Sequence, residues 1–175
     1  MDTPQNTAAK KHTISLFVSN KPGVLIRVAL VFTRRGYNID SLVVSPSQDP
    51  AFSTMNIGAT GDSKTLDQIL KQLNKLVDVL QARDRTGEDI IERELAIIKL
   101  RCSADVRTDI LQIAQAFSCE VVDLSDKSVT FQDSGPTEKL DAVGKVFEPY
   151  GIMEMVRTGK LLMARGEEVT SGITP

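Results

Sequence analysis

The residues best suited to chemistry lie in a turn that begins at Asn20 and leads into a helical pattern. Asn20 is followed by Lys, Pro and Gly23, and the helical pattern starts at Val24. The first N–H groups of a helix lack intrahelical partners and carry partial positive charge, so Gly23, Val24 and Leu25 can bind a carboxylate. Gly23 leaves room for a ligand beside the backbone, and the Asn20 amide can donate to a carboxylate or accept from an ammonium group.

A second asparagine offers the same chemistry from another part of the chain. Asn38 opens an apolar run and precedes Ile39. Ile39 or Leu25 can form a small apolar wall, so the turn and this run together match a free amino acid with a short aliphatic side chain. Asn-x-Pro-Gly before a helix is also the usual composition of a turn and cap, so the residues alone leave both interpretations open.

The rest of the sequence offers no catalytic or metal-binding set. The single histidine, His12, is expected at the surface, and the isolated Cys102 and Cys119 are expected to be buried in a reducing compartment. The stretch TGDSKT lacks the spacing of a phosphate loop and is typical of a helix N-cap, at Asp62 or Ser63. We therefore expect no catalytic residue, no metal site and no cofactor in this chain.

Composition argues against several other classes of function. The chain has 175 residues, a net charge of -2 and 5% aromatic residues. Binding to nucleic acid or to an anionic membrane needs more positive charge, and base stacking needs more aromatic side chains. No stretch approaches the roughly 18 apolar residues of a membrane span, and no secretory signal pattern is present. We expect a cytoplasmic protein that binds neither nucleic acid nor membrane.

Hydrophobic periodicity predicts a βαββαβ order for the first half of the chain. Apolar residues alternate in the strand patterns and recur at i, i+3, i+4 and i+7 in the helical ones. The first helix is expected to bury Leu25, Val28, Ala29 and Phe32 and to end at Gly36. The predicted strands are Thr13–Val18, Tyr37–Val44, Phe52–Thr60 and Leu76–Ala82.

The same order repeats in the second half. Each helix has one apolar stripe and so packs on one surface, which is the arrangement of two helices on one face of a four-stranded antiparallel sheet. The predicted fold class is α+β, with two ferredoxin-like βαββαβ domains in tandem. The predicted strands are Leu95–Cys102, Cys119–Leu124, Ser128–Gln132 and Gly151–Val156, with a short addition at Leu161–Ala164.

Each domain has a thin core, one open sheet face and exposed edges, which favours dimerisation.

Charge and turn residues set the predicted domain boundaries. The predicted segments are a disordered N-terminus at 1–11, a first domain at 12–84, a solvated linker at 85–94, a second domain at 95–166 and a flexible tail at 167–175.

The turn resembles the first loop of the ACT domain, a small-molecule-binding regulatory module. A longer match is more specific, because residues 20–28 (NKPGVLIRV) and 32–42 (FTRRGYNIDSL) are similar to the small, regulatory subunit of acetohydroxyacid synthase, also called acetolactate synthase. Residues 75–79 (KLVDV) and 93–95 (REL) continue the match. The resemblance covers about residues 12–165.

The resemblance implies a non-catalytic subunit that binds and stimulates a large catalytic subunit. It also implies feedback inhibition by valine, or by leucine or isoleucine, and places thiamine diphosphate, Mg²⁺ and FAD on the large subunit. The effector would lie between the ACT domains of a homodimer. Carried over by position, the site residues are Asn20, Gly23, Val24 and Leu25 from one chain, with Asn38 and Ile39 from its partner.

The second half has Ser103-Ala104-Asp105 where such a turn would stand. We expect no effector there and a role in binding the catalytic subunit or supporting the dimer. Two other classes stay open: a free-standing enzyme using Tyr37 or the acidic linker, and a stand-alone ACT-type sensor that regulates another enzyme or transcription. The charge balance opposes DNA binding, and generic carboxylates are all that favours an enzyme.

Overall fold

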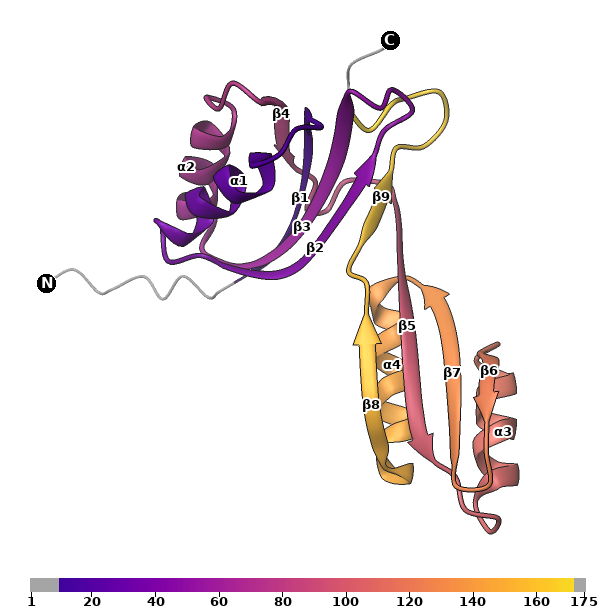
Figure 1. Ribbon diagram of the computed structural model, residues 1–175. Coiled ribbons are helices and arrows are strands. Elements are labelled where there is room, and N and C mark those ends of the chain that lie inside the picture. Colours follow the sequence, from indigo (N-terminus) through magenta and orange to yellow (C-terminus); the bar gives the residue numbers. More distant parts are fainter. Residues whose placement is uncertain (1–9, 172–175) are drawn as a thin grey trace, which may run out of the picture. The chain divides into compact units, whose positions relative to one another are not determined.

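The computed structural model describes residues 10–171, and these form two compact units (Figure 1). Unit 1 contains the described chain up to Ile91 and also the segment that returns at Gly159. Unit 2 is Glu92–Thr158. The polar N-terminal residues 1–9 and the last residues, 172–175, lie outside the described chain, so most of the expected disordered N-terminus and part of the expected tail cannot be compared with it.

Unit 1 is a four-stranded antiparallel sheet with two helices on one face (Figure 1). The strand order is β2-β3-β1-β4, and β1 pairs with β3 from Lys10 opposite Gly61 to Ser19 opposite Phe52. The elements are β1 (Lys10–Ser19), α1 (Val24–Thr33), β2 (Asn38–Pro46), β3 (Phe52–Gly61), α2 (Ser63–Leu73), β4 (Val79–Asp84) and the short β9 (Leu161–Met163).

Alternation along the strands builds the core of unit 1. Ile14, Leu16 and Val18 of β1 are buried beneath the helices, as the period of two predicts. His12 has the same parity and is buried too, with Nδ1 3.6 Å from an Asp84 carboxylate oxygen. The expectation of a surface His12 was wrong, because β1 begins at Lys10 and pairing with β3 carries this end of the strand into the core.

Helix α1 buries part of the predicted face, because Val28 and Phe32 are in the core as expected. The prediction was wrong for Leu25, which is 42% exposed, and Val24 and Val31 are buried instead. Ile26 and Leu30 are exposed as well. The helix is therefore apolar on two sides, and one of these is left uncovered within the described chain.

Helix α2 begins at an acidic cap. The Asp62 side chain accepts a hydrogen bond from the Thr65 N–H at 2.8 Å, so Asp62 rather than Ser63 is the N-cap. The hydrogen bonds from Thr65 also lower the pKa of this carboxyl group. The exposed polar face of α2 and the buried Leu66, Ile69 and Leu73 follow the predicted stripe.

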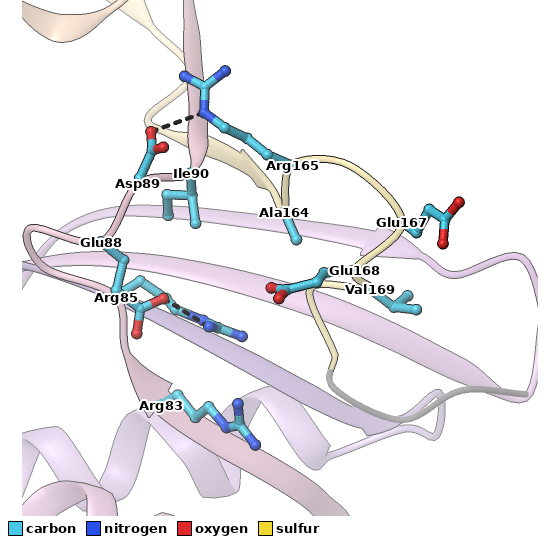
Figure 2. Close-up of a pocket in the computed structure, with 10 residues that line it drawn as sticks. All are labelled: Arg83, Arg85, Glu88, Asp89, Ile90, Ala164, Arg165, Glu167, Glu168 and Val169. Atoms are coloured by element: carbon cyan, nitrogen blue, oxygen red, sulfur yellow. Dashed lines mark hydrogen bonds and ion pairs between the residues drawn. The ribbon is translucent and has the colours of Figure 1, made fainter.

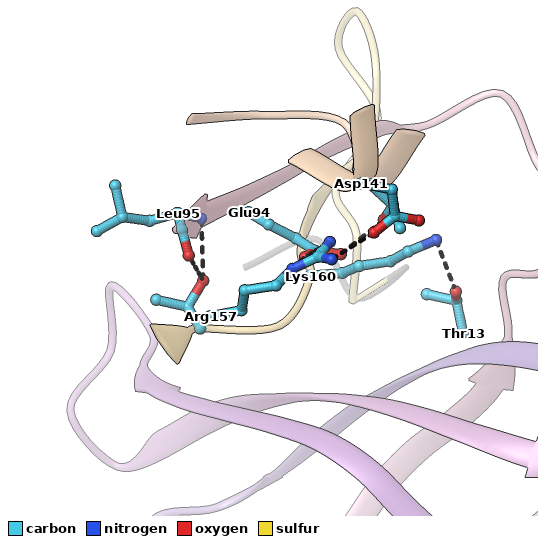
Figure 3. Close-up of polar contacts among 8 residues, drawn as sticks. Thr13, Glu94, Leu95, Asp141, Arg157 and Lys160 are labelled. Carbon is cyan, nitrogen blue, oxygen red and sulfur yellow. Dashed lines mark hydrogen bonds and ion pairs between the residues drawn. The ribbon is translucent and has the colours of Figure 1, made fainter. Parts of the chain in front are cut away.

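The outer face of the unit 1 sheet, opposite the helices, is covered by the end of the chain. Residues 159–171, which we call the strap, lie across it. The Lys160 ammonium group is 3.3 Å from the Thr13 hydroxyl (Figure 3). The Arg85 guanidinium donates to the Thr170 carbonyl oxygen at 2.5 Å.

Unit 2 repeats the topology with the order β6-β7-β5-β8. Its core contains the buried side chains of Ile98, Leu100, Phe131, Phe147 and Cys102. The elements are β5 (Ile91–Arg101), α3 (Arg107–Ala116), β6 (Glu120–Leu124), β7 (Ser128–Gly135), α4 (Thr137–Phe147), the 3-10 turn η1 (Glu148–Tyr150) and β8 (Ile152–Arg157). The predicted fold class, α+β with two βαββαβ units in tandem, is confirmed.

A buried ion-pair network stabilises one end of unit 2. Arg157 bonds to Glu94 at 2.5 Å and to Asp141 at 2.5 Å (Figure 3). Glu94 is 6% exposed and also accepts from the Thr137 hydroxyl at 2.6 Å. Glu94 and Arg85 lie in the segment expected to be solvated, yet both are buried because each has several hydrogen-bond partners.

Candidate functional site

The turn between β1 and α1 is held by backbone and amide hydrogen bonds. The Asn20 N–H donates to the Ala51 carbonyl oxygen at 2.8 Å, and its side-chain nitrogen donates to the Pro50 carbonyl oxygen at 2.9 Å. The Asn20 side-chain oxygen has no partner among residues 10–171. It can therefore accept from a ligand ammonium group, whereas the amide nitrogen already ties the turn to the β2–β3 loop.

Gly23 gives this turn a conformation that brings the helix N-terminus to the surface. Its φ is +83°, and it is the N-cap of α1 without any side-chain cap hydrogen bond. The Val24 N–H makes a long 3.4 Å bond to the Lys21 carbonyl oxygen, while the N–H groups of Leu25 and Ile26 have no partner in the described chain. These two groups are free to donate to an anion, and the Val24 side chain belongs to the core.

The second half of the predicted site lies at the start of β2. Asn38 is exposed, and its amide nitrogen donates to an Asp40 carboxylate oxygen at 2.8 Å. Ile39 is half-buried and packs against the unit 1 core. Within residues 10–171 the Asn38 amide oxygen at the sheet edge has no hydrogen-bond partner, and Ile39 offers part of an apolar side chain.

One chain does not bring the two halves together. Asn20 follows Ser19, which pairs with Phe52, whereas Asn38 pairs with Thr60 at the other end of β3. Thr60 lies opposite Lys11, nine residues before Asn20. At about 3.3 Å per residue, the two asparagines are about 30 Å apart along the sheet.

An ion pair beside the turn was not predicted from the sequence. Arg27 Nη2 lies 2.6 Å from a carboxylate oxygen of Asp78, in the turn that precedes β4. A Cβ atom at Gly23 would lie 3.3 Å from Arg27 Nη1, so the guanidinium covers one side of the glycine. Because 51 positions separate the partners, no local pattern could reveal the pair.

The tyrosine considered for a catalytic role is held in the core of unit 1. Tyr37 is buried and its hydroxyl donates to the Asp62 carbonyl oxygen at 3.4 Å; burial, aided by Asp62, Asp84 and Asp40, raises the pKa of the phenol. Among residues 10–171 no three His, Cys, Asp or Glu side chains gather as metal ligands would. No helix in this part of the chain is long and apolar enough to cross a membrane.

Unit 1 also contains a polar cavity of about 570 Å³ away from the predicted site (Figure 2). It lies between the residues that follow β4 and the strap. Arg83, Arg85 and Arg165 contribute its positive charge, and Glu88 and Asp89 are among the carboxylates that balance it. None of the residues predicted to bind the effector lines it.

Two family profiles match this chain, one in each half. Residues 14–81 match the profile described as "AHAS small subunit-like ACT domain". Residues 93–166 match the profile described as "Small subunit of acetolactate synthase". The first match contains the β1–α1 turn and the start of β2, and so all six residues of the predicted site.

Individual relatives match over nearly their whole length. The acetolactate synthase small subunit of Mycolicibacterium smegmatis is 42% identical over 155 residues, 89% of this chain and 91% of the relative. A probable acetolactate synthase small subunit of Methanothermobacter thermautotrophicus is 43% identical, over 89% and 93%. The crystal structure of the acetolactate synthase small subunit from Thermotoga maritima has a TM-score of 0.79 at 36% identity and covers 90% of this chain and 99% of its own. This chain belongs to the family of acetolactate synthase small subunits.

Proposed function

We propose that this chain is the non-catalytic regulatory subunit of an acetolactate synthase, which stimulates the catalytic subunit and makes it sensitive to a branched-chain amino acid. Membership of the acetolactate synthase small-subunit family supports association with a catalytic subunit. The observation that carries effector binding is the split site, in which the anion donors of α1 and the Asn38 amide lie at opposite ends of one sheet. Thiamine diphosphate, Mg²⁺ and FAD would then belong to the catalytic subunit.

Two copies can complete the site that one copy leaves divided. β2 is an edge strand, and α1 connects β1 to β2 by crossing β3. If two β2 strands pair antiparallel about a two-fold axis, the partner subunit's Asn38 reaches the end of the sheet where Asn20 and Gly23 lie. The exposed apolar face of α1, with Ile26 and Leu30, would be buried in the same interface.

The chemistry of the two halves selects the ligand class. The N–H groups of Leu25 and Ile26 suit a carboxylate, and the side-chain oxygens of Asn20 and of the partner subunit's Asn38 suit an ammonium group. Leu25 is partly exposed and Ile39 is half-buried, so each has apolar surface left for a short branched side chain. Valine, leucine and isoleucine each have a carboxylate, an ammonium group and a short branched apolar side chain.

Inhibition requires that the effector binds one state of the holoenzyme better than another. A difference of about 1–3 kcal/mol corresponds to roughly 5–150-fold in affinity. An effector held between two copies would stiffen the joined sheets and so favour one arrangement of the surfaces that meet the catalytic subunit.

Co-purification with the catalytic subunit, followed by an activity assay with each amino acid, tests the proposal. We expect a stable complex, higher activity than the catalytic subunit alone, and inhibition by at least one branched-chain amino acid. Calorimetric titration of the small subunit alone should show binding of that amino acid. Binding without a complex would identify a stand-alone sensor, and neither a complex nor binding would reject the proposal.

A further inference from the structure

The strap is fastened to unit 1 by polar contacts from a buried arginine. Arg85 is 9% exposed, and its guanidinium donates to Ser15 Oγ at 3.1 Å, Glu88 Oε2 at 2.7 Å and the Thr170 carbonyl oxygen at 2.5 Å. One side chain therefore joins the sheet, the turn after β4 and the strap, and Figure 2 shows its bond to Glu88. The Ala164 N–H, which donates to Thr170 Oγ1 at 2.8 Å, closes the strap on itself.

The strap touches both strands that lead to the halves of the proposed effector site. On β1 its Lys160 contacts Thr13 directly (Figure 3). Arg85, which is bonded to Thr170 of the strap, links it to Ser15 of the same strand. On β2 it meets Ser41, because a Cβ atom at Gly159 would lie 2.7 Å from the Ser41 Cβ atom. β1 and β2 are not neighbours, since β3 separates them, so the strap bridges across the sheet.

The part of the strap after β9 has few apolar contacts with unit 1. Ala164, Arg165, Glu167, Glu168 and Val169 line the polar cavity of about 570 Å³, and of the residues lining its other side only Ile90 is apolar. Segments with few buried apolar contacts open at low free energy. Residues 161–163 are held as strand β9 with Leu162 buried, whereas polar contacts rather than a packed core keep residues 164–171 in place.

We infer that the strap is a coupling element: fastened by Arg85, it transmits effector occupancy from the unit 1 sheet to unit 2. The strap follows Thr158, the last residue of unit 2, without a break, so a change in how β1 and β2 are placed on either side of β3 moves the chain that leaves unit 2. The inference rests on the proposed regulatory function. It separates two steps of that function, namely effector binding and the response to binding. Release of the strap leaves effector binding intact and removes the response to binding.

The test compares Arg85→Met with Arg83→Met. Arg85→Met keeps the aliphatic stem and removes every donor, and the Glu88 carboxylate it leaves behind is 41% exposed, so no buried charge is left unpaired. Arg83 lines the same cavity two positions earlier on β4, is exposed and makes no recorded bond to the strap in the described chain. It therefore controls for loss of one positive charge in the cavity.

Three quantities are measured in the holoenzyme or in the full-length small subunit: hydrogen exchange of the strap, affinity for valine, leucine and isoleucine, and their inhibition of activity. For Arg85→Met we expect strap amides to exchange at least about tenfold faster, the affinity of the small subunit to change less than about threefold, and half-inhibition to need at least about tenfold more effector. Stimulation of the catalytic subunit should be retained. Arg83→Met should match the wild type in all three.

The other outcomes overturn the inference. Unchanged exchange would show that Arg85 does not fasten the strap, and faster exchange with normal inhibition would show that the strap transmits nothing. Loss of affinity together with inhibition would make the strap part of the binding site. A chain ending at Arg165 removes Thr170 without altering the sheet, and it must give the same result if Arg85→Met fails to fold. A wild type that binds no branched-chain amino acid rejects the proposed function instead, and strap exchange still tests the fastening.

Discussion

Gly23 gives the turn a backbone conformation that favours glycine, and its lack of a side chain leaves space for a ligand. Its positive φ is strained for any residue with a Cβ atom, and one side of it is already occupied by the Arg27 guanidinium. Arg27 in turn neutralises Asp78, which would otherwise repel an anion near the N-terminus of α1. The anion site of the proposed effector therefore depends on a glycine and on an ion pair, and only the glycine was visible in the local sequence.

Gly23→Asp should abolish inhibition by the effector and retain stimulation of the catalytic subunit. The new carboxylate would lie near Arg27 and the free N–H groups of α1, where it competes with the effector carboxylate. Gly23→Ala is the matched control, because it carries the same strain, about 1–2 kcal/mol of stability, without the charge. Titration calorimetry should give weak binding for Ala and none for Asp. Equal effector affinities of the two variants would show that the added carboxylate does not compete with the effector. Loss of stimulation in Gly23→Asp alone would contradict a purely sensing role for this turn.

Cys119 should make stability fall at alkaline pH. Burial, aided by the Asp133 carboxylate, raises the pKa of this thiol to about 11, above its ordinary value of 9.0. Above pH 9 the unfolded thiol ionises while the native thiol keeps its proton, so the stabilising contribution is complete below pH 9 and is lost as pH rises towards 11. Wild type and Cys119→Ser should differ in the pH dependence of unfolding only in this window. Parallel curves from pH 8 to 10.5 would contradict the shifted pKa.

At the scale of elements, the polar network of unit 2 fixes the register of β5 and β8 at the end where they enter and leave the unit. Arg157 of β8 reaches Glu94 of β5 and Asp141 of α4. It therefore ties two strands and a helix where the chain crosses between units. A buried carboxylate that loses its only cation is costly, so the network makes this end of unit 2 sensitive to single substitutions.

Arg157→Met should destabilise unit 2 by about 3–5 kcal/mol, because it leaves the buried Glu94 unpaired. Adding Glu94→Gln should recover most of that loss, since the amide can still accept from Thr137. Arg165→Met is the control: its ion pair with Asp89 is exposed and should contribute no more than about 1 kcal/mol. Hydrogen exchange of core amides in unit 2 measures each effect. A small loss for Arg157→Met alone would mean that Glu94 does not depend on this cation.

The order of the elements could be predicted because alternation and helical periodicity are local. Which face of α1 is buried could not be predicted, since Val24 and Leu25 are both apolar and only packing against the sheet decides between them. The burial of Arg85 depends on Ser15 and Thr170, 70 and 85 positions away, and no pattern around residue 85 contains that information. The residues of the proposed site were chosen from the turn sequence and the family resemblance, whereas their separation between opposite ends of the sheet is visible only in the strand register.

At the scale of the whole molecule, dimerisation should depend on the uncovered face of α1. Ile26→Glu places a charge in the centre of the proposed interface and should weaken self-association at least about 100-fold. Binding of the effector should be lost with it, because the partner subunit's Asn38 is removed. Val77→Glu is the control, since Val77 is 98% exposed on the turn before β4, away from the β2 edge. Sedimentation equilibrium measures the self-association of both variants. If Ile26→Glu is still a dimer, the interface lies on another surface.

Unit 2 is also closed at its own ends. The Leu95 N–H donates to Thr158 Oγ1 at 3.1 Å, and the Thr158 N–H donates back to the Leu95 carbonyl oxygen at 3.0 Å. A domain whose entry and exit lie side by side can be exchanged as a cassette, because its replacement needs only two adjacent splice points. Grafting Glu92–Thr158 from a relative would leave the sensor and its fastening untouched, so chimaeras of this kind can reveal which half of the subunit chooses the enzyme it serves.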